Sequence, residues 1–258
     1  MAIEITYVRM LLVLSIPSLK IMTNFLNAKW ENLIMANYSI APEILSPYLP
    51  KGTELDFHEG KTFVSLVGFL FRDTKIFGLP IPFLGTFEEI NLRFYVIRKV
   101  NNEVRRGVVF VNETVPNRFV ALVANYMYKE HYTAVPTSHQ WGVDEQFKRV
   151  KYQWINDKEW KAIYAEARLE SAPLRIGSEE EFIFEHYFGY TRIDDKISEE
   201  YRVQHPQWNV NEVVKYEINC NFGTMYGNDF AFLNHEKPHS VFLAEGSDVS
   251  VKWKRDRF

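Results

Sequence analysis

The feature that most constrains the fold is a succession of strand-like segments joined by very short links. Residues 91–99 alternate between Leu, Phe and Val on one face and Arg, Tyr and Ile on the other. Residues 61–71 are apolar on both faces, as in a buried central strand. Residues 147–154 and 159–169 alternate around a turn at Asp157. Parallel strands need long crossover connections, so the short links predict an α+β fold dominated by antiparallel sheet.

A few short helices are expected to accompany the sheet. Pro42 opens one and Pro50 stops it. Asn117 is a suitable N-cap for the clearest helix, in which apolar residues recur at helical spacing up to position 127. Ser178 has the Ser-x-x-Glu form of a capping box and predicts a helix that continues to about His186. Strands still outnumber helices, which supports the α+β interpretation.

The chain reads as one folded domain after a short N-terminal extension. No repeat, low-complexity tract or Gly/Ser linker divides residues 22–258 of this 258-residue chain. Residues 10–16 are apolar but much shorter than the ~20 residues of a membrane-spanning helix. No small-residue cleavage site follows them before Lys20, so a signal peptide is not favoured. We therefore expect residues 1–21 to lie outside a single domain that begins at Met22.

Charge and cysteine content narrow the possible partners. The net charge of −3 argues against nucleic acid, which requires a basic face. Cys220 is the only cysteine, so no intrachain disulfide or thiolate metal cluster forms. The expected location is the cytoplasm, without membrane association.

Aromatic residues make up 16% of the chain, and they cluster with His and Arg in two places. Residues 185–190 read Glu-His-Tyr-Phe-Gly-Tyr, and residues 201–208 read Tyr-Arg-Val-Gln-His-Pro-Gln-Trp. Such side chains combine large apolar bodies with polar tips and suit the wall of a half-dry pocket. The pattern indicates a small-molecule cavity but not the reaction, if any, that takes place in it.

Several segments in combination resemble the YqjF-like family of uncharacterised bacterial proteins. They are residues 30–38, 49–53, 67–71, 91–96, 106–110, 187–190, 203–208 and 240–247. The resemblance implies an acetoacetate decarboxylase-like fold, in which a large antiparallel sheet curls into a cone or barrel around an internal pocket. Enzymes of that superfamily form a lysine Schiff base with a keto acid. Fold-level similarity alone does not assign this function.

The resemblance makes Lys129 a candidate Schiff-base lysine, because it follows the helix that begins after Asn117. An amine nucleophile must be neutral, and lysines of this kind are activated by a neighbouring cation. Here the next residue is Glu130, whose charge would favour the ammonium form instead; His131 comes after it. Glu130 and His131 are the candidate proton carriers. The alternative is an ordinary solvated lysine at a helix C-terminus.

Other candidates for the pocket carry both a structural and a functional interpretation. Arg93 either enters the cavity, where its planar fork would hold a carboxylate, or forms a surface ion pair. His205 and Trp208 flank Pro206, and they either line the pocket or support the core. The same two interpretations apply to His186 and Tyr190.

No cofactor or metal is expected. His235 and His239 are four residues apart, but Pro238 prevents the regular helix that would align them as ligands. Neither a phosphate-binding glycine loop nor a carboxylate-rich calcium loop is present in the sequence.

Three functional hypotheses remain open. The first is a cavity that binds a small molecule bearing a carboxyl or carbonyl group, with catalysis undecided. The second is a lyase in which Lys129 forms the Schiff base, Arg93 holds the substrate carboxylate, and Glu130 or His131 moves protons. The third is a structural module, for instance one that forms homo-oligomers, whose aromatic residues serve as core and interface.

Overall fold

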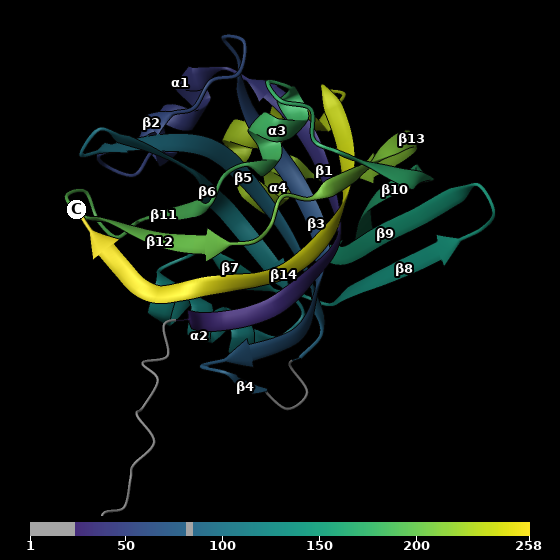
Figure 1. Cartoon of the computed structure of the whole chain (residues 1–258), viewed down its shortest axis with the longest axis horizontal. Coiled ribbons are helices and arrows are strands. Elements are labelled where there is room, and N and C mark those ends of the chain that lie inside the picture. The colour runs from purple at the N-terminus through teal and green to yellow at the C-terminus, as the bar shows by residue number, and fades with distance from the viewer. Residues whose placement is uncertain (1–23, 81–84) are drawn as a thin grey trace, which may run out of the picture.

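The computed structural model describes residues 24–80 and 85–258, and its centre is a closed barrel (Figure 1). Each barrel strand pairs with its neighbours in a single sheet, and β14 also pairs with β1, which closes the ring. All these pairs are antiparallel except β6 with β11. The barrel strands are β1 (Asn24–Ile40), β3 (Thr62–Ile76), β5 (Phe87–Val100), β6 (Glu103–Val115), β11 (Phe188–Arg192), β12 (Ser198–Gln204) and β14 (Ser240–Arg257).

Four further strands extend the sheet and fold against the outside of the barrel. They follow β14 in the order β13 (Asn209–Asn219), β10 (Glu159–Pro173), β9 (Phe147–Asn156) and β8 (Thr137–Val143). Leu92 and Phe94 of β5 share one hydrophobic core with Tyr152 and Trp154 of β9. This packing explains why residues 62–71 of β3 are buried on both faces: one face lies against the outer layer and the other looks into the barrel.

The interior of the barrel is filled at one end by a second hydrophobic core. Tyr95, Phe63 and Trp208 belong to it, together with three consecutive buried residues of α3 (Glu179–Phe184). In Figure 1, α3 lies at one end of the barrel and α2 (Arg118–Tyr128) at the opposite end. The segment after α2 continues into β7 (Tyr132–Ala134), which pairs in parallel with β6.

The helix signals in the sequence are borne out with one difference in length. The Asn117 side chain accepts hydrogen bonds from the backbone of Phe119 and Val120, and Ser178 accepts one from Glu181. However, α3 ends at Phe184 rather than near His186, because Glu185 leaves the helical conformation and the chain turns toward β11. α2 also exposes several apolar side chains, namely Phe119, Leu122 and Tyr126.

The remaining elements are short. α1 (Pro42–Leu45) continues into the 3-10 helix η1 (Ser46–Tyr48), as the prolines predict. α4 (Phe222–Tyr226) and the 3-10 helix η2 (Asn228–Asn234) add Phe222 and Phe230 to the outer core, while β2 (Glu54–Leu55) and β4 (Leu79–Pro80) pair at strand ends. The N-terminal extension proposed for residues 1–21 lies outside the described residues. Within the described ranges, no helix has the length and apolar character needed to cross a membrane.

Candidate functional site

The end of the barrel next to α2 is hollow. A cavity of about 170 Å³ lies between the barrel strands and the inner side of α2. A cavity of ~150 Å³ is enough to hold a benzene molecule. Most of the wall is apolar and aromatic, and it includes Phe25, Trp30, Phe69, Phe71, Phe110 and Phe119.

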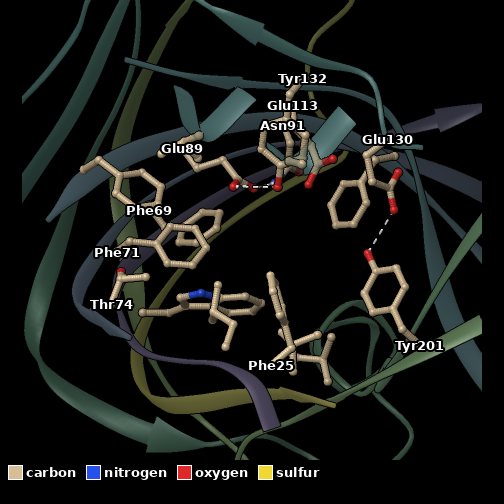
Figure 2. A pocket seen from close by; sticks show the side chains of 18 of the residues that line it. Phe25, Phe69, Phe71, Thr74, Glu89, Asn91, Glu113, Glu130, Tyr132 and Tyr201 are labelled. Atoms are coloured by element: carbon tan, nitrogen blue, oxygen red, sulfur yellow. Dashed lines mark hydrogen bonds between the residues drawn. The ribbon is translucent and has the colours of Figure 1, made fainter. Parts of the chain in front are cut away.

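One wall of this cavity carries charged and polar side chains. Glu89, Asn91 and Arg93 occupy alternate positions of β5, so all three point to the same face of the sheet. Glu113 of β6 is the direct cross-strand partner of Asn91. Glu130 reaches the cavity from the segment between α2 and β7. Figure 2 shows the carboxyl groups of Glu89, Glu113 and Glu130 along one side of the cavity, with Phe25 on the other.

Uncharged side chains donate hydrogen bonds to two of these three carboxyl groups, those of Glu89 and Glu130. Asn91 Nδ2 donates to Glu89 Oε1 over 3.0 Å, and the Tyr132 hydroxyl donates to Glu89 Oε2 over 3.3 Å. Glu130 Oε1 accepts from the hydroxyls of Thr191, at 2.6 Å, and Tyr201, at 3.2 Å. The ring of Tyr201 packs over Gly189, its cross-strand partner, where a β-carbon would collide with the ring.

The three carboxyl groups are buried and influence one another. Burial raises the pKa of Glu89 and of Glu130 to about 7. The pKa of Glu113 is raised further above its ordinary value, by burial and by repulsion from Glu130 and Glu89. No Lys, Arg or His of the described chain forms an ion pair with any of the three. The wall can therefore hold or release protons near neutral pH.

The cavity also gathers polar atoms that lack partners. Five of its lining residues have a buried side-chain nitrogen or oxygen with no hydrogen-bond partner among the described residues. Leaving such an atom unsatisfied costs about 1–3 kcal/mol, so a group of them makes this wall costly for the folded chain. The atoms are Trp30 Nε1, Thr74 Oγ1, Asn91 Oδ1, Arg93 Nε and Glu113 Oε2.

Arg93 is the cation of this wall. It is buried, its guanidinium lies 5.8 Å from the centre of the Tyr95 ring, and Nη2 donates to the Met35 sulfur over 3.8 Å. No carboxylate of the described residues lies within 4.0 Å of it, although its charge acts on Glu89. The sequence left open whether Arg93 meets the cavity or solvent, and the structure places it in the cavity wall.

Comparison with known proteins assigns the family. The model of the DUF2071 family, described as an uncharacterised conserved protein, matches residues 27–248. The chain belongs to this family. The uncharacterised protein YqjF of Bacillus subtilis (strain 168) is 28% identical over 196 residues, which cover 74% of this chain and 77% of that protein. The resemblance inferred from the sequence is thus confirmed.

Solved structures confirm the fold expected for the family. The acetoacetate decarboxylase-like enzyme from Sphingomonas wittichii RW1 is similar with a TM-score of 0.61 at 10% identity, over 91% of this chain and 93% of that one. The enduracididine biosynthesis enzyme MppR complexed with pyruvate gives a TM-score of 0.61 at 10% identity, over 91% of each chain. At such low identity the similarity shows the acetoacetate decarboxylase-like fold alone.

Two predicted candidates are exposed and are not among the residues that line the cavity. Lys129 ends α2 in a left-handed conformation, and its Nζ lies 5.6 Å from the centre of the Tyr126 ring. His131 is exposed as well. Glu130, between them, is buried in the cavity wall. No lysine is present among the described lining residues.

Four other candidates make their contacts outside the cavity. His186 Nε2 is 3.1 Å from Asp56 Oδ2, and burial lowers the pKa of its imidazole to about 4. The Tyr190 hydroxyl donates to the backbone oxygen of Arg105 over 3.2 Å. His205 stacks on Trp208, with ring centres 4.1 Å apart, and Trp208 Nε1 donates to Ser247. None of these four lines the cavity, so their contacts match the structural interpretation.

Several lining residues were not singled out from the sequence. Tyr201 lies in the aromatic segment that indicated a pocket, but only its neighbours were chosen. Glu89 and Asn91 carry a readable signal, since they alternate with apolar residues on a strand that otherwise looks buried. No sequence signal marks Glu113 and Tyr132 as cavity residues, because their position depends on how β6 and β7 pair. In the described residues, no group of three or more side chains is arranged to hold a metal ion.

Proposed function

We propose that the barrel cavity binds a small molecule with a compact apolar body and a carbonyl or carboxyl head. The observation that carries this proposal is the set of five unpartnered buried polar atoms in an otherwise apolar hollow. Burial of unsatisfied polar groups is costly, and empty volume in a core also lowers stability. A ligand that fills the space and supplies hydrogen bonds offsets both costs.

Arg93 is the residue that supports a carbonyl or carboxyl head. Its guanidinium is a planar donor that matches oxygen acceptors, and no carboxylate of the described chain competes for it within 4.0 Å. Trp30 Nε1 is a second unpartnered donor in the same wall. The structural neighbour MppR is complexed with pyruvate, which carries both kinds of head. That complex is consistent with the proposal but belongs to a different protein.

The lyase hypothesis based on Lys129 has weaker support. A Schiff base requires an amine that reaches the bound carbonyl, and Lys129 is exposed at the end of α2. The purely structural hypothesis is also weaker, because a module selected only for stability gains nothing from a hollow with unsatisfied polar atoms.

Binding can be tested with ligands that share an isobutyl body. Methyl isobutyl ketone and isovalerate are titrated into the protein by isothermal calorimetry, with protein-observed NMR as a second readout. We expect both to bind, and Arg93→Met to weaken isovalerate binding about tenfold because one charge-assisted hydrogen-bond partner is lost. Arg72→Met is the matched control, since Arg72 lies on β3 but pairs with Glu31 at the surface.

Two results would contradict the proposal. One is the absence of binding by every member of the series, with no chemical-shift change in the lining residues. The other is an affinity for isovalerate that is the same in Arg93→Met as in the unmodified protein.

A further inference from the structure

We infer that the ligand also carries a protonated amino group, which Glu113 and Glu130 receive at the acidic end of the cavity. This inference rests on the proposed binding function and names the chemistry of its second contact. The ligand class is a small compound with an ammonium group at one end and a carbonyl or carboxyl group at the other.

The first argument is that no Lys, Arg or His of the described residues forms an ion pair with either carboxyl group. Glu113 and Glu130 are 3% and 7% exposed, and both line the cavity. Arg255 influences Glu130 electrostatically, but its Nη1 is bound to Glu199 over 3.1 Å. A buried carboxylate without a cationic partner is costly, so an ionised Glu113 requires a cation from outside the chain.

The second argument is the supply of unused acceptors. Glu113 Oε2 and Asn91 Oδ1 are cross-strand neighbours, and each lacks a hydrogen-bond partner among the described residues. An ammonium group carries three hydrogens to donate, so it can satisfy both oxygens at once. A single hydroxyl satisfies only one of them.

The third argument is the aromatic surroundings of the acidic end. Tyr132 lies next to Glu113 and Tyr201 next to Glu130 in Figure 2, and Phe110 also lines the cavity. The faces of such rings attract cations, particularly where water is excluded. Carboxylates combined with aromatic rings therefore favour an organic ammonium group over a neutral head.

Other occupants of the acidic end fit less well. A metal ion would need several carboxylates grouped around one point, and the described residues contain no such group. An anion would be repelled by the three carboxyl groups or would force all of them to remain protonated. A neutral alcohol leaves Glu113 protonated and is kept as one arm of the test.

Arg93 and Glu113 are spaced to bind the two ends of one small molecule. Asn91 stands opposite Glu113, and Arg93 lies two residues further along β5, past an irregularity in the register. Diagonal neighbours in a sheet are roughly 7–8 Å apart, a span that a molecule of a few carbon atoms can bridge. A short ω-amino acid, in which several methylene groups separate the amino group from the carboxyl group, has this form.

Amine binding changes the proton balance in a measurable way. Near neutral pH the carboxyl groups hold protons in the empty cavity, because burial raises the pKa of each one. When an ammonium ion binds, a carboxyl group gives up its proton to solvent and the resulting carboxylate pairs with the ammonium. The expected signature is proton release on binding, whereas binding of a carboxylate such as isovalerate gives proton uptake or none.

The experiment extends the series with isoamylamine, isoamyl alcohol and 5-aminopentanoate. Each compound is titrated by calorimetry at pH 7 in two buffers that differ in ionisation enthalpy and contain no primary amine, so that proton release is counted. We expect isoamylamine and 5-aminopentanoate to bind with release of up to about one proton. Glu113→Gln should weaken both about tenfold or more and leave isovalerate within about twofold.

Controls separate this inference from the proposed function. Glu103→Gln removes an exposed carboxylate from the same strand and should change nothing. Glu130→Gln is the second variant if Glu113→Gln does not fold, as judged by circular dichroism. Two outcomes would overturn this inference but not the proposed function. One is that isovalerate or the ketone binds and the amines do not. The other is that the amines bind without releasing a proton and with the same affinity in both glutamine variants. Failure of the whole series would overturn the proposed function instead.

Discussion

At the scale of single residues, the unusual feature is the placement of Arg93, Glu89, Glu113 and Glu130 inside a barrel rather than on its surface. Isolated buried charges cost several kcal/mol, and neutral donors offset only part of that cost. Tyr132, Thr191 and Tyr201 solvate two of the carboxyl groups, while Glu113 keeps one oxygen unpartnered. Such an arrangement is retained at a cost to stability, which is typical of a binding or catalytic site.

The stability of the protein should reveal these carboxyl groups through its pH dependence. Glu89 and Glu130 have a pKa of about 7 when folded, above the ordinary carboxyl value, so the folded state holds protons that the unfolded chain has released. Their contribution to stability is fully present below about pH 4.3, where the unfolded carboxyl groups are also protonated, and is lost as pH rises from there through about 7. His186 and His205, with pKa values lowered to about 4 by burial, act in the opposite direction at pH below about 6.5.

Below about pH 6.5 these opposing contributions largely cancel, so the free energy of unfolding should change little there and fall between about pH 6.5 and 8. Each pKa unit contributes about 1.4 kcal/mol, so the fall is measurable by urea denaturation followed by circular dichroism. The double variant Glu89→Gln/Glu130→Gln should make this alkaline fall shallower, because neither amide titrates and only Glu113 continues to contribute. If the free energy of unfolding of the unmodified protein stays level or rises up to pH 8, the pKa values of these carboxyl groups are not raised in the folded state.

At the scale of elements, the sequence predicted features set by neighbouring residues, such as helix caps. It did not predict features that depend on the path of the chain in space. Asn117 and Ser178 were predicted as caps because their side chains bond to amides two or three residues away. Strand alternation limits each side chain to two directions, and the side chain of Arg93 takes the one that faces the cavity. Lys129 was selected by its position after α2, but the left-handed turn at this residue directs the chain so that Glu130 enters the cavity instead.

The end of α2 offers a direct prediction about Lys129. Its φ of 54° lies in the region that glycine adopts without steric cost, and helices commonly end with glycine at such a position. Lys129→Gly should raise the free energy of unfolding by about 0.5–1 kcal/mol and leave ligand binding unchanged. Lys129→Ala, which keeps the β-carbon, should bring no gain.

The same variant tests the lyase hypothesis. The unmodified protein incubated with pyruvate and borohydride should show no covalent adduct at position 129 by mass spectrometry. An adduct that disappears in Lys129→Gly would support a Schiff base despite the exposed position, and would contradict the preference for a binding function.

At the scale of the whole molecule, the cavity exists because β1 and β14 close the sheet into a ring. Closure brings together Glu89, Glu113, Glu130 and Tyr201, which come from four separate segments of the chain. The resemblance to a known family predicted a curled sheet with an internal pocket. It did not predict which half of the interior would be filled, because that depends on the summed volume of side chains such as Phe63, Tyr95 and Trp208 and not on any local pattern.

The seam between β1 and β14 depends on Gly246. Its φ of +82° is strained for any other residue, and a β-carbon there would collide with the backbone oxygen of Trp30 and come within 3.0 Å of Leu33 Cδ1. Gly246→Ala should therefore separate the two strands, lower the free energy of unfolding by about 2 kcal/mol or more, and weaken ligand binding because Trp30 lines the cavity. Gly142→Ala on the exposed strand β8, where a β-carbon meets nothing within 4 Å, is the matched control. Equal stability and equal affinity in the two variants would contradict this prediction. They would mean that the pairing of β1 with β14 is not what keeps the cavity in shape.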